Sequence, residues 1–241
     1  RGGGEPPDKK VFTMMPCQGG LDLSGKNDLT SLELAAQDSE GDWHVLSFFW
    51  APGENLRERE LQEKRPYVLW RDQAYLLVTP GRTINYRFVA RKIAEIRADY
   101  NLVSLRFDPW RIDDLKEALE EVGVDCWVLG EDWKEGDRKP RPTGLCLVPH
   151  GQGYKSMNPA IENLEDLLKE RRLRHGNHPV LTMCASNVRI KADEAGNRKF
   201  DRNKSVGRID GLVALAMAVS EPPMQVKPFV SNYETEGLWA V

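Results

Sequence analysis

Residues 84–129 constrain the fold most, because helical and strand patterns alternate along them. Residues 84–100 place apolar side chains at helical spacing, and residues 102–107 follow as a short apolar strand. A second helix is predicted over residues 112–122 and a second strand over residues 124–129. Two strands joined by a helix normally pair in parallel, with the helix crossing one face of the sheet. These residues therefore predict a parallel α/β unit.

The beginning of the chain predicts antiparallel strands instead. Residues 11–15 are apolar enough for a first strand, and residues 29–36 alternate between apolar and polar side chains as a second strand does. Residues 43–50 are rich in Phe and Trp, which favours a third strand on a half-buried sheet. The predicted fold class is α/β, with a mixed sheet of three antiparallel strands followed by parallel strands, flanked by helices.

The remaining elements are predicted from apolar spacing and composition. They are a helix over residues 54–64, a short strand or loop over 144–148, a helix over 158–174, a strand or short helix over 179–186, a basic hairpin around 193–197 and an apolar helix over 212–219. The basic run at residues 169–174 then lies at a helix C-terminus, where cations interact favourably with the helix dipole. Asp210 lies in the first turn of the final helix, which must be buried on several sides.

Composition bounds the domain organisation. With 241 residues, 40% of them hydrophobic, the chain can bury one substantial core, which we assign to residues 11–220. Residues 1–10 resemble a linker at the edge of a fragment of a longer protein, and residues 221–241 form an irregular tail. No apolar run approaches the roughly 20 residues that a membrane-spanning helix needs, so a soluble protein is expected. The four scattered cysteines favour reduced thiols over a zinc site or a disulfide framework.

Charge is distributed unevenly along the chain. The formal net charge of -3 gives no general attraction for nucleic acid, so a nucleic-acid partner must contact a local basic patch. Such a patch is predicted around the basic hairpin, where seven cations crowd one segment: Arg189, Lys191, Arg198, Lys199, Arg202, Lys204 and Arg208. The patch can hold a phosphate backbone or form an ordinary solvated hairpin, and the residues alone do not decide between the two.

Three aspartates are candidate functional residues, although each also has an ordinary structural explanation. Asp22 can be a turn residue of the hairpin, Asp108 a strand-end residue that caps the next helix, and Asp210 a helix-terminal carboxylate. The residues around Asp22 approach a phosphate-binding loop, but Asn27 stands where that loop needs a hydroxyl, and no clear helix follows. We therefore exclude a nucleotide-binding loop.

The predicted topology brings these three aspartates together. The first strand can lie beside the strand that ends at Asp108, and the buried final helix can lay Asp210 across the same corner. Three converging carboxylates repel one another unless divalent cations neutralise them, and hard oxygen ligands select Mg²⁺ or Mn²⁺. Two such ions about 4 Å apart hydrolyse phosphodiesters. The sequence therefore predicts a metal-dependent nuclease site.

The order of these features resembles the C-terminal nuclease domain of the large terminase subunit of tailed bacteriophages. The resemblance is carried by Gly20-Leu21-Asp22-Leu23-Ser24, Asp28-Leu29-Thr30, Phe107-Asp108-Pro109-Trp110-Arg111, Gly151-Gln152-Gly153, His175-Gly176-Asn177-His178-Pro179-Val180, Asn187, Lys204 and Ile209-Asp210-Gly211. It extends from the first strand to the final helix. The order and spacing of the stretches carry it together, and no single stretch is specific.

The resemblance implies a ribonuclease H-like fold and a DNA endonuclease that cuts concatemeric double-stranded DNA during genome packaging. It implies that Asp22, Asp108 and Asp210 bind two divalent cations, Mg²⁺ or Mn²⁺. Asn187 and Lys204 match family positions that support the site or contact a phosphate, and Asp28 either joins the metal ligands or shapes the hairpin. From the charge pattern of the basic segment, the expected DNA-binding residues are Arg189, Lys191, Arg198, Lys199, Arg202 and Arg208.

The resemblance also implies partners and a place of action. In the family the nuclease follows a packaging ATPase domain, which is absent from this chain, so we expect DNA cleavage without ATP hydrolysis. The other implied partners are the portal, the small terminase subunit and further copies of the chain, with no membrane. The implied location is the host cell cytoplasm, outside the mature virion. Two alternatives stay open: another ribonuclease H-like nuclease, such as a transposase or resolvase, and a non-catalytic packaging-assembly module.

Overall fold

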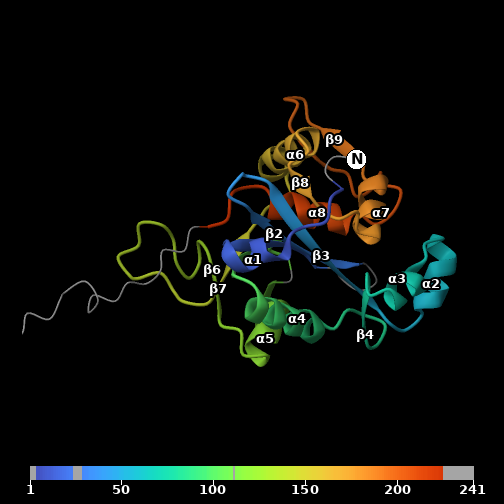
Figure 1. Ribbon diagram of the computed structural model, residues 1–241, viewed down its shortest axis with the longest axis horizontal. Helices are drawn as coiled ribbons and strands as arrows, with labels where there is room; N and C mark the ends of the chain where they lie inside the picture. Colours follow the sequence, from blue (N-terminus) through green and yellow to red (C-terminus); the bar gives the residue numbers. More distant parts are fainter. Residues whose placement is uncertain (1–3, 24–28, 111, 225–241) are drawn as a thin grey trace, which may run out of the picture.

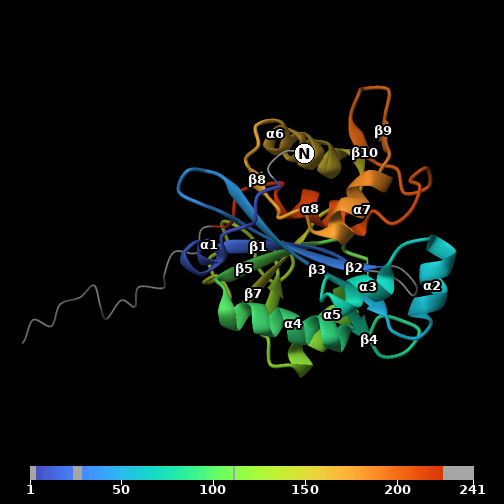
Figure 2. The ribbon, with the colours of Figure 1, turned by 45° about the vertical axis from the view of Figure 1, so that its right-hand side comes forward.

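A mixed sheet separates two helical layers (Figures 1 and 2). The computed structural model describes residues 4–23, 29–110 and 112–224. In spatial order, the strands are β4 (Leu77–Thr79), β3 (Trp43–Pro52), β2 (Thr30–Gln37), β1 (Cys17–Asp22), β5 (Leu102–Phe107), β7 (Leu145–Pro149) and β6 (Cys126–Val128), with β8 (Leu173–Arg174) pairing to β3. A separate hairpin consists of β9 (Ile190–Ala192) and β10 (Arg198–Phe200).

The pairing confirms the predicted sheet. Strands β1, β2 and β3 pair antiparallel, whereas β1 with β5, β5 with β7 and β6 with β7 pair in parallel. The parallel strands have helical crossovers because α4 (Tyr86–Asp99) precedes β5 and α5 (Ile112–Glu121) follows it. Residues 144–148, for which the sequence predicts a short strand or a loop, lie mainly in a strand inside the sheet, β7.

Alternation along the strands gives the sheet two apolar faces. Leu21, Leu32 and Leu105 point to the face covered by α4 and α5. The opposite face packs against α6 (Tyr154–Lys169), α7 (Pro179–Asn187) and α8 (Asp210–Ala218). Figure 2 shows these two layers on either side of the sheet. The helical alternative for residues 179–186 is thus the one adopted, in α7.

Three short helices lie outside the two layers. They are α1 (Lys9–Met14), α2 (Leu56–Glu63) and α3 (Tyr67–Asp72). The predicted first strand at residues 11–15 is wrong, because these residues belong mainly to α1 and the strand begins at Cys17. Asp8 caps the helix, since its side chain accepts a hydrogen bond from the Lys10 amide at 2.9 Å. The apolar side chain of Phe12 is fully buried although it lies on a helix and not on a strand.

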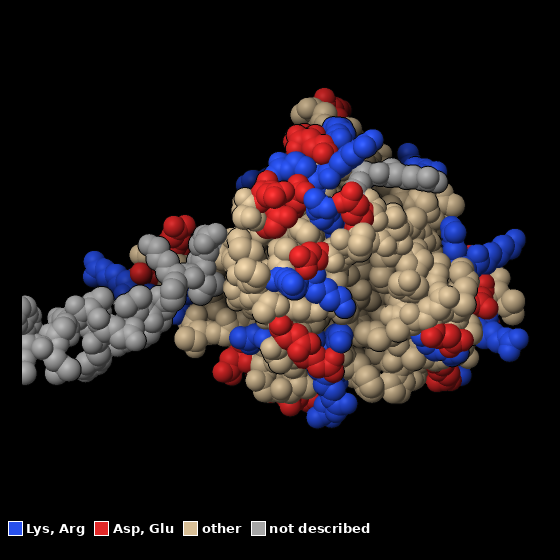
Figure 3. All heavy atoms as spheres, viewed as in Figure 1, with Lys and Arg blue, Asp and Glu red and all other residues tan. Residues whose placement is uncertain are grey.

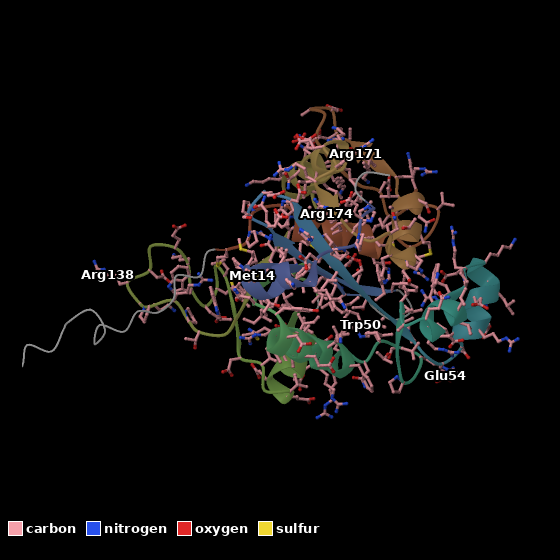
Figure 4. All side chains as sticks on the ribbon, viewed as in Figure 1. Met14, Trp50, Glu54, Arg138, Arg171 and Arg174 are labelled. Carbon is pink, nitrogen blue, oxygen red and sulfur yellow. The ribbon has the colours of Figure 1, made fainter. Side chains whose placement is uncertain are left out.

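The predicted helix over residues 158–174 is shifted. Helix α6 begins at Tyr154 and ends at Lys169, and Arg171 then takes a left-handed φ of 60°. Most of the basic run therefore lies beyond the helix. Arg174, labelled in Figure 4, belongs to β8, where it forms ion pairs with Asp42 at 2.7 Å and with Glu5.

The segment before α1 contacts the domain. The Gly176 amide donates a hydrogen bond to the Glu5 carbonyl at 2.9 Å, and the Asp8 amide donates to His44 Nδ1 at 2.9 Å. The linker-like residues are thus held against β8 and β3 from Gly4 onward, and those before Gly4 lie outside the described residues. None of the helices in the described ranges is long and apolar enough to cross a membrane.

Helix α8 lies directly on β1 at Gly20. A Cβ atom at Gly20 would lie 1.8 Å from the carbonyl oxygen of Ala214 and 2.7 Å from the amide nitrogen of Ala218. Both atoms are backbone, so they cannot turn away as a flexible side chain does. Only glycine allows the helix to approach the strand this closely.

One carboxyl is buried within the sheet itself. Glu33 on β2 is fully buried and accepts hydrogen bonds from Ser47 Oγ at 2.6 Å and from Ser31 Oγ at 3.2 Å. Burial raises the pKa of Glu33 well above its ordinary value, and the two hydroxyl groups lower it only in part. A lone glutamate in an alternating strand was the sequence signal for this group.

The contact at Gly20 predicts that Gly20→Ala is strongly destabilising. We expect the free energy of unfolding to fall by about 3 kcal/mol, since the new methyl group forces α8 away from β1. Urea denaturation measures this. Gly153→Ala is the matched control, because no heavy atom lies within 4 Å of a Cβ placed there. A loss at position 20 no larger than that of the control contradicts the close contact.

Glu33 predicts a pH-dependent stability. Its folded pKa is raised above the ordinary value of 4.5, so its stabilising contribution is complete below pH 4.5 and is lost as the pH rises toward the folded pKa. Gln at position 33 cannot titrate. The free energy of unfolding of Glu33→Gln minus that of the wild type should therefore grow above pH 4.5, by up to about 1.4 kcal/mol per pH unit.

Urea denaturation at several pH values between 4.5 and 7 checks this prediction. Glu117→Gln makes the same chemical change at an exposed position of α5 and serves as the control. A difference between Glu33→Gln and wild type that stays constant with pH contradicts a protonated Glu33.

Candidate active site

The three aspartates lie at one edge of the sheet. Asp22 is the last residue of β1, Asp108 directly follows β5, and Asp210 is the first residue of α8. Because β1 and β5 are parallel neighbours, their carboxyl ends meet at the same edge. The contact of α8 with β1 then brings the N-terminus of the helix to the same place.

Arg202 joins two of these carboxylates. Its Nη2 lies 2.6 Å from Asp22 Oδ2 and its Nη1 lies 3.4 Å from Asp210 Oδ1. Asp22 and Asp210 are only 5% and 4% exposed, whereas the Arg202 side chain is 47% exposed. A single guanidinium group therefore covers two buried carboxylates from the solvent side.

Burial makes both carboxylates reluctant to ionise. Desolvation raises the pKa of Asp22 to about 7, the charge of Arg202 acts against this rise, and the charges of Asp210 and Asp108 add to it. Desolvation likewise raises the pKa of Asp210, and Arg202 again opposes it. Concentrated positive charge beside such a pair of buried acids stabilises their ionised form.

Asp108 is held differently. It is half-buried, and its Oδ1 accepts a hydrogen bond from the Trp110 amide at 3.2 Å. Its charge acts on Asp22, so the two lie within electrostatic range. However, across residues 4–23, 29–110 and 112–224, no three His, Cys, Asp or Glu side chains are close enough to hold one metal ion together. The carboxylates share an edge of the sheet, but here two of them contact an arginine.

The loop that carries Arg202 is anchored by its neighbour. Asp201 is buried, and its Oδ1 accepts hydrogen bonds from the amides of Asn203 and Lys204, both at 3.2 Å. The Asp201 carbonyl accepts from Ser205 Oγ at 2.7 Å. The backbone at Arg202 is therefore fixed while its side chain reaches the carboxylates.

The predicted supporting residues occupy different surroundings. Asn187, buried at the end of α7, accepts a hydrogen bond from Arg65 Nη2 at 3.1 Å and donates one to the Arg208 carbonyl at 3.0 Å. It thus joins α7 to the loop that leads into α8. Lys204 is exposed on the loop of Arg202. Asp28 lies outside the described residues.

The predicted DNA-binding residues do not form one uniform patch. Arg198 pairs with Glu165 at 2.8 Å, Arg208 pairs with Glu63 at 3.0 Å, and Lys199 lies over the ring of Tyr154. Arg189 is exposed, Lys191 is half-buried, and both extend from the start of the hairpin. On the face shown in Figure 3, basic and acidic side chains are intermixed between wide uncharged areas.

Two features of the site were missed from the sequence. Arg202 was assigned only to DNA, whereas it contacts the carboxylates. His150 was not considered, although it directly follows β7, beside the β5 end that carries Asp108, and its amide donates to the Phe107 carbonyl at 2.8 Å. Its Nδ1 is buried and has no hydrogen-bond partner among the described residues. A histidine at the carboxyl end of a short apolar strand was an available signal.

The chain matches a known protein family along most of its length. The matching family is described as "Terminase large subunit, endonuclease domain", and it covers residues 11–134 and 141–225. A terminase large subunit from Enterobacteria phage HK97 is 44% identical over 200 residues, which is 83% of this chain and 36% of that protein.

Solved structures agree with this match. The crystal structure of the HK97 large terminase superposes with a TM-score of 0.77 at 42% identity, covering 90% of this chain and 41% of that one. The large terminase nuclease of thermophilic phage G20c, solved with bound magnesium, gives a TM-score of 0.53 at 14% identity and covers 90% and 92% of the two chains. At that identity the second comparison supports the fold alone. The present chain spans about two fifths of the HK97 relatives.

Proposed function

The chain belongs to the family of terminase large subunit endonuclease domains, and on that premise we propose that it is a metal-dependent endonuclease that cuts double-stranded DNA. In a full-length terminase this reaction cuts concatemeric DNA during genome packaging. The proposed mechanism is phosphodiester hydrolysis with two divalent cations, Mg²⁺ or Mn²⁺.

One observation carries the proposal. Two buried carboxylates, Asp22 and Asp210, converge on a single cationic group, and Asp108 ends the adjoining strand. Acids that serve only as helix caps or turn residues do not need to lie together at one edge of a sheet. Their convergence from three distant parts of the chain supports a site for positive charge.

The donor chemistry fits Mg²⁺ or Mn²⁺. Asp22, Asp108 and Asp210 supply hard carboxylate oxygens, and the low exposure of Asp22 and Asp210 leaves few competing waters. The magnesium bound by the phage G20c nuclease, which shares the fold, agrees with this donor set. When bound, two such ions activate a water molecule and stabilise the leaving oxygen of the phosphodiester.

The residues of this chain position the substrate and the ligands. Asp22 and Asp210 would hold one side of the metal site and Asp108 the other, because they extend from β1, α8 and β5 respectively. The exposed cations Arg189, which precedes β9, and Lys204, on the loop of Arg202, would contact DNA phosphates. Asn187 would keep the loop before α8 in place through its bond to the Arg208 carbonyl.

The wider assignment follows from the family. We assign residues 11–220 to the nuclease domain and expect it to act with a packaging ATPase domain, the portal, the small terminase subunit and other copies of the chain. The expected place of action is the cytoplasm of the infected host cell. The nuclease itself should not hydrolyse ATP.

Loss of one aspartate should abolish cleavage. We expect the wild-type chain to nick or linearise plasmid DNA with Mg²⁺ or Mn²⁺ and not with EDTA, and Asp108→Asn to be at least about 100-fold slower, because the neutral amide binds the cation weakly. Asp22→Asn should be equally inactive and should remain folded, since it removes a buried charge. Gel electrophoresis of the plasmid measures both.

Asp99→Asn is the matched control, because Asp99 is exposed at the end of α4 on the other face of the sheet. Circular dichroism establishes that each variant is folded. Undiminished cleavage by folded Asp22→Asn and Asp108→Asn would refute the proposed site and favour an assembly role for the domain.

A further inference from the structure

The contact between Arg202 and the two buried carboxylates is the most unusual feature of the site. The arginine extends from the loop between β10 and α8, whereas Asp22 ends β1, 180 residues away in the sequence. Its guanidinium group lies 2.6 Å from Asp22 and 3.4 Å from Asp210. Arg198 and Arg208 of the same segment pair with Glu165 and Glu63, although the charge of Arg208 also acts on Asp210.

The guanidinium group and a divalent cation cannot use the same oxygens at once. A Mg²⁺ ion binds carboxylate oxygen at about 2.1 Å, which is closer than the guanidinium nitrogen lies now. Two cations sharing Asp22 Oδ2 would be nearly in contact and would repel each other. The charges also differ, because one guanidinium leaves a net negative charge on the two carboxylates and a divalent ion balances both.

The surroundings of Arg202 allow its side chain to move while its backbone stays. Asp201 anchors the loop through the amides of Asn203 and Lys204. A hollow of about 210 Å³ lies beside the arginine, and Gln152, Lys191 and Lys199 are among the residues that line it. A released guanidinium group has room there and would add a third cation to a surface where a DNA phosphate can approach.

We propose that Arg202 and the divalent cation compete for Asp22 and Asp210, so that Arg202 sets the cation concentration that the site requires. This inference rests on the proposed nuclease function and adds a positioning residue to it. Without the cation, Arg202 stabilises the two buried carboxylates. Binding of the cation releases the guanidinium group toward the hollow beside β10.

Cation binding in the absence of DNA tests the competition. Isothermal titration with Mn²⁺ should show roughly tenfold tighter binding by Arg202→Gln than by the wild type, because the competing charge is gone. Arg202→Lys should lie between them, since one ammonium group cannot span both carboxylates. In the wild type, Mn²⁺ should leave hydrogen exchange at the Asn203 and Lys204 amides unchanged, because Asp201 still holds them.

Arg189→Gln is the matched control, because it removes the same charge from the same basic segment, and among the described residues the Arg189 guanidinium donates to the Val188 carbonyl rather than to a carboxylate. An equal gain of affinity in this control, or unchanged or weaker Mn²⁺ binding by Arg202→Gln, overturns the competition. If Arg202→Gln unfolds without metal, the Arg202→Lys titration tests the competition by itself. An Mn²⁺ affinity of Arg202→Lys equal to that of the wild type then refutes the competition.

The two proposals fail in distinguishable ways. Wild-type cleavage that needs metal, combined with unchanged Mn²⁺ affinity in Arg202→Gln, refutes the competition and leaves the nuclease function standing. Tighter Mn²⁺ binding by Arg202→Gln, combined with cleavage that is insensitive to Asp108→Asn, supports the competition and refutes the catalytic assignment.

Discussion

The approach of α8 to β1 is the contact on which the rest of the site depends. Gly20 allows the helix backbone to lie against the strand, and Gln18 Nε2 holds the far end of the helix through the Ala218 carbonyl at 2.7 Å. With both points fixed, the first residue of the helix, Asp210, lies beside the last residue of the strand, Asp22. The acidic pair is therefore a consequence of how α8 packs on β1 at Gly20 and Gln18.

This packing places two carboxylates where water reaches them poorly. Such groups are costly to keep charged, and the fold offsets the cost with a guanidinium group that contacts both. The guanidinium group balances part of this negative charge from a loop that Asp201 anchors.

The other side of the site is less restrained. Asp108 is half-buried and contacts the amide of Trp110, whose side chain is 75% exposed. His150, at the end of the neighbouring strand, keeps a buried nitrogen without a partner among the described residues. The two halves thus differ in packing: α8 lies against β1 at Gly20, whereas the β5 half carries a half-buried aspartate and an exposed tryptophan.

The sequence by itself determined the mixed sheet and the positions of Asp108 and Asp210 in their elements, because periodicity and strand ends are local properties of the chain. It misjudged residues 11–15, since five residues are too few to separate a capped helix from a strand, and it extended α6 past Lys169 into β8. Only the tertiary structure decided which of seven clustered cations meets the acids. Arg202 and Asp22 are far apart in sequence, and their contact depends on how closely α8 packs on β1, which no local pattern encodes.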